Sequence, residues 1–159
     1  MPGYNPKKGE GHIWPCVLTV ILCMLLTVFI TFANSVAVVK QTVRNSRVVL
    51  DNYVMADSIA IYNAIKQGSD KDESLNAAKY RTSLADFCTF AQSGSYYYNY
   101  DNDGNVQYYI SAPSLSYVKD KSLKIETHYT IYVPIYFAGV RVGTAEVPVS
   151  VRSKLTEKW

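Results

Sequence analysis

An uncharged apolar segment near the start of the chain is the feature that most restricts its fold. Ile13 to Ala33 covers 21 residues, in which Thr19, Thr27 and Thr31 are the only polar side chains. A threonine hydroxyl can bond to its own helix backbone, so it is tolerated in lipid. As a helix, the segment spans about 31 Å, which matches a hydrocarbon core about 30 Å thick. This length without charge favours a membrane-spanning helix over a buried core helix.

The residues at the ends of this segment fit the same interpretation. Trp14 lies at one end, where an amphipathic ring prefers the headgroup layer, and Pro15 falls in the first helical turn, where its missing N–H costs little. A cleaved secretory signal is the alternative, because residues 33–37 include small side chains, but its apolar region spans only about 7–15 residues. We therefore predict a transmembrane helix over 13–35.

The charges on either side of the segment barely favour one orientation in the membrane over the other. Lys7 and Lys8 precede it and three basic residues follow between 40 and 47, so the positive-inside count is nearly tied. A short basic tail before the first apolar helix is typical of a signal anchor. We therefore predict a single-pass protein of the cell membrane, with residues 1–12 cytoplasmic and the C-terminal part outside the cytoplasm.

The helix is predicted to continue past the membrane. No glycine or proline occurs between Cys16 and Gln67, and Gly68 then supplies a C-terminal cap. This predicts an amphipathic stalk helix over 36–67, interrupted on its apolar face by Ser46 and Asp57. The apolar residues of that face are Val36, Val39, Val43, Leu50, Val54, Ile61 and Ile65.

A second helix is predicted at the start of an α+β domain that covers 68–159. Residues 69–73 are typical of a turn and an acidic first helical turn, and residues 93–95 close the helix after about Gln92. Its predicted core residues are Leu75, Ala78, Tyr80, Leu84, Phe87, Cys88 and Phe90.

The remaining residues have the alternation of strands. Residues 96–100 and 106–111 flank a turn at 101–105 and predict a hairpin. This turn resembles part of a calcium loop, but the twelfth position, which should be a bidentate Glu, is Ala112. The hairpin interpretation is therefore favoured.

A second hairpin is predicted from residues 123–137, a turn at Ala138 and Gly139, and a return strand over 140–152. Pro134 and Pro148 cannot donate to a ladder, so each should lie at an edge, a bulge or a strand start. The two hairpins give an antiparallel sheet of about four strands with one face on the helices.

Tyrosine is unusually frequent, with 14 tyrosines against five phenylalanines. A half-buried antiparallel sheet explains this composition, and a surface that docks onto a protein or a glycan is the sharper alternative. The candidate partner-binding residues are Tyr96, Tyr97, Tyr98, Tyr100, Tyr108 and Tyr109.

No catalytic or ligand-binding motif stands out. His12 and His128 have no partners at metal-ligand spacing, and the phosphate-binding and nucleophile motifs are missing from the sequence. Cys88 is the only cysteine outside the apolar segment, so we expect it to be a small buried hydrophobe. The net charge of +3 and the lack of basic runs argue against nucleic-acid binding. We expect no cofactor, no metal, no small-molecule substrate and no enzymatic activity.

The layout resembles the TadE-like family, the minor pilins or pseudopilins of tight-adherence (Flp-type) pilus and type IV-like secretion systems. The resemblance lies in the residues before the apolar helix, Lys7 to Gly11, and in the C-terminal pattern of Val133-Pro134, Gly139 and residues 151–153. It implies a pilin-like fold, peptidase processing at Gly9 or Gly11, and partners among other pilin-like or pilus and secretion-machine subunits.

One position departs from the family. Its members usually carry a Glu five residues after the cleavage glycine, where this chain has Trp14 (counting from Gly9) or Cys16 (from Gly11). An accessory protein that stays in the membrane beside the assembly machine is therefore a related alternative.

Contacts with neighbouring helices are predicted within the membrane. Small side chains allow close helix approach there, and the candidate contact residues are Cys16, Thr19, Cys23 and Thr27, with a lipid-facing position as the alternative.

Overall fold

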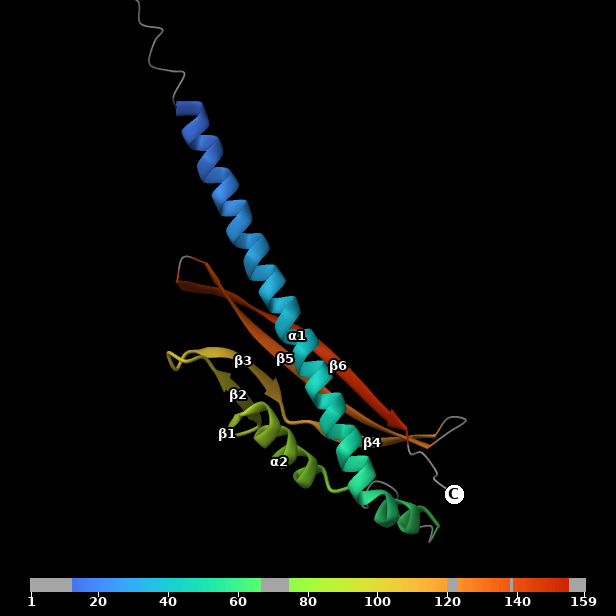
Figure 1. Ribbon diagram of the computed structural model, residues 1–159. Coiled ribbons are helices and arrows are strands. Elements are labelled where there is room, and N and C mark those ends of the chain that lie inside the picture. Colours follow the sequence, from blue (N-terminus) through green and yellow to red (C-terminus); the bar gives the residue numbers. More distant parts are fainter. Residues whose placement is uncertain (1–12, 67–74, 120–122, 138, 155–159) are drawn as a thin grey trace, which may run out of the picture. The chain divides into compact units, whose positions relative to one another are not determined.

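A computed structural model describes residues 13–66, 75–119, 123–137 and 139–154 of the chain (Figure 1). They form two compact units, 1–36 and 37–159, which are described separately below. The architecture is α+β, and its elements in chain order are α1 (Ile13–Lys66), α2 (Ala77–Cys88), β1 (Ala91–Ser93), β2 (Tyr96–Tyr100), β3 (Val106–Ser111), β4 (Ser114–Lys119), β5 (Leu123–Phe137) and β6 (Val140–Lys154).

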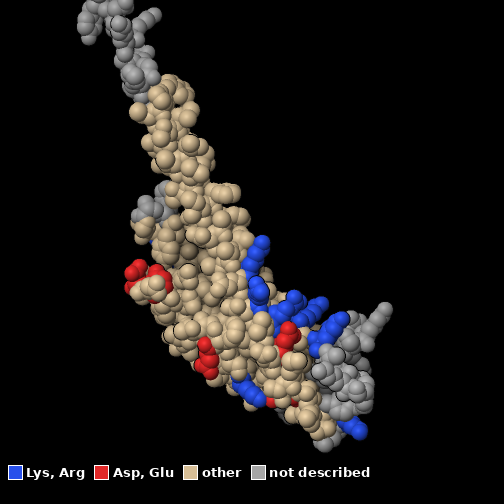
Figure 2. All heavy atoms as spheres, in the orientation of Figure 1, with Lys and Arg blue, Asp and Glu red and all other residues tan. Residues whose placement is uncertain are grey.

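The first unit contains the apolar part of α1, whose side chains are exposed nearly all round. Its threonine hydroxyls donate to backbone carbonyls one turn back: Thr19 to Pro15 over 2.7 Å, and Thr27 to Cys23 over 2.9 Å. This part of α1 shows no charged side chain in Figure 2. α1 is the one helix in the described part of the chain that is long and apolar enough to cross a membrane. An anchor helix or a signal sequence would both have these properties.

The second unit is built around an antiparallel sheet of six strands. β5 is its longest inner strand: it pairs with β4 and β3 on one side and with β6 along nearly its whole length on the other. Both predicted hairpins, β2–β3 and β5–β6, are confirmed. The expected number of strands is too low, because β1 has only three residues and β4 was not predicted, although its Leu115 and Tyr117 alternate with serines and pack against the core.

The two prolines lie where a missing donor is tolerated. Pro148 is in β6, which pairs only with β5 and therefore forms an edge of the sheet. Pro134 lies in β5 beyond Tyr132, the last residue of that strand paired with β3. Both positions fit the rule that prolines avoid the doubly paired part of a sheet.

The second helix is shorter than predicted at its C-terminal end. Asn76 caps its start by accepting a hydrogen bond from the Lys79 backbone N–H at 2.9 Å. Thr89 adopts a left-handed conformation (φ 56°) and ends the helix after Cys88. Ala91 and Gln92, predicted to be the end of the helix, instead form β1 with Ser93 and pair with β2. Gly68 and the acidic residues 69–73 lie outside the described residues.

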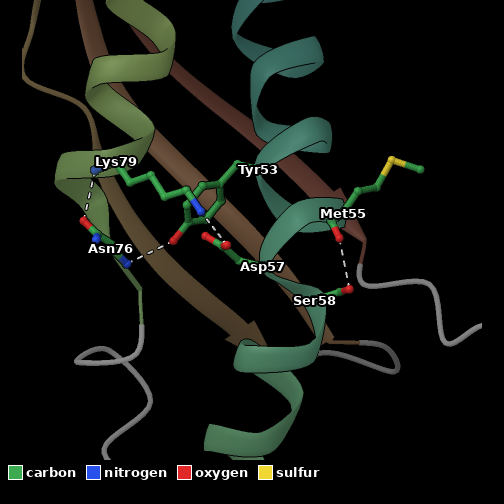
Figure 3. A network of polar contacts seen from close by, with 6 residues as sticks. All are labelled: Tyr53, Met55, Asp57, Ser58, Asn76 and Lys79. Atoms are coloured by element: carbon green, nitrogen blue, oxygen red, sulfur yellow. Dashed lines mark hydrogen bonds and ion pairs between the residues drawn. The ribbon is translucent and has the colours of Figure 1, made fainter.

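Side-chain contacts hold the start of α2 against α1 (Figure 3). The Asn76 backbone N–H donates to the Tyr53 hydroxyl at 2.9 Å, and Lys79 Nζ lies 2.6 Å from Asp57 Oδ1. The ion pair is largely exposed, so its contribution to stability is small. Asp57, which interrupts the predicted apolar face, thus has a partner at the edge of the core.

The core lies between the two helices and one face of the sheet. Most of the predicted apolar face of the stalk contributes to it: Leu50, Val54 and Ile61 are buried, whereas Val36 remains exposed. Of the residues predicted for the second helix, Ala78 and Phe87 are exposed instead of buried. The fully buried apolar side chains are Leu50, Ile61, Tyr80, Leu84, Pro113, Ile110, Ile125 and Ile131.

Polar side chains of α1 connect the helix to the sheet. The hydroxyl of fully buried Ser46 lies 2.6 Å from that of Tyr129 on β5. Burial raises the pKa of Tyr80, which donates to the Ser46 carbonyl, to about 12, and it also raises the pKa of Tyr129. The Ser153 hydroxyl on β6 donates to Asp51. Ser46 therefore joins the helix to the sheet and does not merely interrupt the apolar face.

We expect Ser46→Ala to lower the free energy of unfolding by about 1–3 kcal/mol, because it leaves the buried Tyr129 hydroxyl without this partner. Urea unfolding of the full chain in detergent, followed by circular dichroism, measures the change. Ser58→Ala is the matched control, since the Ser58 hydroxyl bonds only to the Met55 carbonyl of its own helix. Equal stability of the two variants would contradict the role of Ser46.

Candidate functional site

Five tyrosines cluster on the face of the sheet opposite the core. We call them the tyrosine surface: Tyr96, Tyr98 and Tyr100 from β2, Tyr109 from β3 and Tyr132 from β5. Tyr109 stacks on Tyr132 with ring centroids 4.9 Å apart and on Tyr98 at 5.1 Å. Tyr96 meets Tyr98, Tyr109 and Tyr132 edge-on, at 5.6–6.4 Å.

The strand register produces this arrangement. Tyr98 lies directly opposite Tyr109, and Tyr109 lies directly opposite Tyr132, so the three rings form one row across three strands. Aromatic pairs at such positions contribute about 0.5–1.5 kcal/mol beyond their area burial. The rings are partly held by one another and still reach solvent, with Tyr96 39 % and Tyr100 47 % exposed.

The structure divides the six tyrosines predicted as a contact surface. Tyr97 and Tyr108 point into the core and are 5 % and 8 % exposed, so they are unavailable to a partner. Tyr108 packs edge-on against Phe90 at 5.8 Å. Strand alternation explains the division, because neighbouring residues of a strand face opposite sides. The prediction omitted Tyr132, whose place beside Tyr109 depends on a pairing of distant strands.

A charged cluster lies further along β5 on the same face. The Glu126 side chain is only 4 % exposed; it accepts hydrogen bonds from Arg152 Nε at 2.9 Å and from the Ser150 hydroxyl, and His128 Nε2 lies 3.7 Å away. The bond from Ser150, and then Arg152, lower the pKa of Glu126. These neighbours thus favour the ionised form of the Glu126 carboxylate.

The β2–β3 turn uses its carboxylate locally. Asp101 Oδ1 accepts from the backbone N–H groups of Asn105 at 2.8 Å and Asp103 at 3.0 Å, and these bonds lower the pKa of Asp101. The hairpin interpretation of this segment is confirmed. Among the described residues, no group of three His, Cys, Asp or Glu side chains is placed to hold a metal ion.

The candidate contact residues of the membrane segment lie along the first part of α1. Cys16 and Cys23 are exposed free thiols, and the hydroxyls of Thr19 and Thr27 are occupied by the helix backbone. Their contact with a neighbouring helix stays a prediction. The candidate processing glycines, Gly9 and Gly11, lie outside the described residues. Cys88 is buried, as predicted, and burial raises its pKa.

Comparison of the chain with protein-family models, with curated proteins and with solved structures finds no significant match. The resemblance to TadE-like proteins therefore rests on the sequence pattern alone and stays a prediction. What the chain does has to be argued from its own geometry.

We expect the two sets of tyrosines to respond differently to substitution. The double variant Tyr98→Ser, Tyr132→Ser should keep the fold and lose about 1–3 kcal/mol, because it removes partly exposed stacked rings. The matched variant Tyr97→Ser, Tyr108→Ser should lose more than twice as much, because it opens cavities in the core. Urea unfolding of both full-length variants in detergent measures the difference. Equal losses would mean that the tyrosine surface is part of the core.

Proposed function

We propose that this chain is a membrane-anchored, pilin-like component of a tight-adherence pilus or a related secretion machine, and that it acts by assembly and not by catalysis. The observation that supports the proposal is the use of one helix for two purposes. The first part of α1 is apolar and exposed, and its later part forms one wall of the core of an α+β head.

This division of α1 is suited to assembly. Exposed apolar side chains are satisfied by lipid before assembly and by the helices of neighbouring subunits afterwards, so a subunit can exchange one environment for the other at little cost. Thr19 and Thr27 already return their hydroxyls to the helix. Neither environment then leaves them unsatisfied. The head, placed outside the cytoplasm, presents the sheet to other subunits.

The residues at the family's charge position set the form of the proposal. Trp14 and Cys16 carry no charge, so neither can form the ion contact that draws a pilin into a filament. We therefore favour a subunit that acts at the membrane, beside the filament or at its base. In that role its partners are other pilin-like or machine subunits.

We expect oxidative crosslinking in native membranes to join chains to partner subunits through Cys16 and Cys23, because both thiols are exposed on the apolar part of α1. Ladders should appear on a non-reducing gel. Cys16→Ser and Cys23→Ser should each shorten the ladder, and the double variant should abolish it. Buried Cys88 provides the internal control, since it should not react. A chain that stays monomeric under these conditions would contradict the assembly role.

A second candidate function is favoured by the tyrosine surface. Five partly exposed tyrosines on one face of the sheet offer flat aromatic area with hydroxyl groups, which is suited to a protein or glycan partner. In this alternative the chain is a signal-anchored extracytoplasmic binding module. The variant Tyr98→Ser, Tyr132→Ser separates the two functions. Loss of partner binding while crosslinking through Cys16 and Cys23 is retained supports the binding module. Loss of that crosslinking while partner binding is retained supports assembly through the helix.

A further inference from the structure

One side of β6 has no neighbouring strand. β6 pairs with β5 alone, and no described residue forms a backbone hydrogen bond to the side of β6 that faces away from β5. We call this side, from Thr144 to Lys154, the open edge. β6 has 15 residues, which is long for a strand, so the open edge offers an extended row of backbone groups. Such a row is a template for pairing with a strand of another chain.

A hydrogen bond on β5 shows which residues of β6 turn their backbone groups to the open edge. The Thr130 N–H donates to the Ser111 hydroxyl on β3 at 2.9 Å, so the backbone of Thr130 faces β3 and not β6. The residue opposite Thr130 in β6 is Pro148. Opposed residues of an antiparallel pair turn their backbone groups both toward each other or both away, in alternation along the strands. The backbone N and C=O of Pro148 therefore point to the open edge, as do those of every second residue of β6.

Pro148 lies near the middle of the open edge and has no N–H to donate. Within the sheet it removes no hydrogen bond, because its backbone N does not face β5. A strand placed against the open edge would lose one hydrogen bond at this residue and would meet the proline ring. Prolines at such positions are one means by which natural proteins prevent the pairing of sheet edges.

Apart from Pro148, the open edge is complementary to a second copy of itself. When two copies of β6 run antiparallel with Val149 opposite Val149, Glu146 lies opposite Arg152 at both ends of the pairing. Both of these side chains are exposed, and opposite charges at directly opposed positions stabilise a sheet. In the same register Val147 lies opposite Val151, on the face that packs against the core. The side chains of this register therefore favour a second copy of the chain as the partner of β6.

We propose that Pro148 prevents the head from pairing with a second copy of the chain through β6. In the register with Val149 opposite Val149, each Pro148 lies opposite Ser150 of the other copy, next to the two-fold axis. The carbonyl of that Ser150 receives no hydrogen bond, and the proline ring keeps the two strands apart at the centre of the pairing.

The direction of the helices gives this block a use. The two copies of α1 would run in opposite directions in such a pair, because a two-fold axis perpendicular to the sheet reverses them. Chains that are anchored in one membrane with the same orientation run in the same direction. Pairing through β6 would be a misassembly of such chains, and this step alone rests on the proposed membrane-anchored function.

Removal of the proline in the full chain tests the block. Pro148→Thr supplies the missing N–H with a residue that favours strands. Val149→Cys reports the pairing, because opposed residues that are not hydrogen-bonded have Cα atoms about 4.5 Å apart, within the range of a disulfide. All chains carry Cys16→Ser and Cys23→Ser, and Cys88 is buried, so residue 149 has the one thiol able to join two copies. The chains are oxidised in dilute detergent and separated on a non-reducing gel.

The chain with Pro148→Thr and Val149→Cys should give at least tenfold more disulfide-linked dimer than the chain with Val149→Cys alone. Addition of Glu146→Lys should lower this yield, because it places like charges opposite each other at Arg152. Pro134→Thr is the matched control. It removes a proline from β5, opposite Thr144, and should leave the yield at that of the chain with Val149→Cys alone. Circular dichroism checks that each variant is folded.

Equal yields with and without Pro148 would overturn the proposal. Strong crosslinking at residue 149 while Pro148 is present would also overturn it, because the open edge would then pair despite the proline. A Pro148→Thr chain without Val149→Cys should sediment as a dimer, and sedimentation identical to that of the parent chain would count against the block independently of the disulfide. Ladders through Cys16 and Cys23, which test the assembly role, are measured on chains that retain Pro148, so the two proposals can fail separately.

Discussion

The fold depends on a change of surroundings along a single helix. α1 has no helix-breaking residue between Pro15 and its end at Lys66, so nothing in the backbone separates its apolar part from its amphipathic part. The first part has no buried side chain, and the later part buries a stripe that includes Leu50 and Ile61. The helix whose apolar burial stabilises the folded head is therefore also the element suited to anchor the protein in a membrane.

The contact between α1 and the sheet combines apolar packing with specific polar bonds. Leu50 and Val54 remove apolar area from water, which supplies most of the stabilisation but fixes orientation poorly. Ser46 with Tyr129, and Asp51 with Ser153, join defined atoms of the helix to defined residues of β5 and β6. A shift of the helix by one turn would leave the buried hydroxyls of Ser46, Tyr129 and Ser153 without these partners, so the bonds fix the register of the helix on the sheet.

Local patterns explain which parts of the fold are predictable from sequence. The apolar run, the absence of helix breakers and the period-2 alternation on either side of Gly139 depend on neighbouring residues, and they correctly indicate α1, β5 and β6. α2 ends early because Thr89 takes a left-handed conformation. The sequence does not indicate this end, because a β-branched residue rarely adopts a positive φ. β1 forms because it pairs with β2, and its three residues carry no local signal of a strand. β4 does carry one, since Leu115 and Tyr117 alternate with serines.

The candidate site was predictable only in part for the same reason. Alternation along 96–100 and 106–111 separates the inward Tyr97 and Tyr108 from their outward neighbours, and it could have been applied to the sequence. The place of Tyr132 in the row of rings could not, because it requires the register between β3 and β5. The role of Ser46 was not predictable either. A polar residue on an apolar face is explained here only by the position of its hydrogen-bond partner, Tyr129, on β5.

One uninterrupted helix, α1, joins the apolar segment to the core of the head. Hydrogen–deuterium exchange of the full chain in nanodiscs, resolved over peptides that cover residues 30–46, tests it most directly. We predict slow exchange throughout, with amides 34–41 protected as well as those around the buried Thr42 and Ser46. Exchange of amides 34–41 at the rate of an unstructured chain, between two protected flanks, would contradict it.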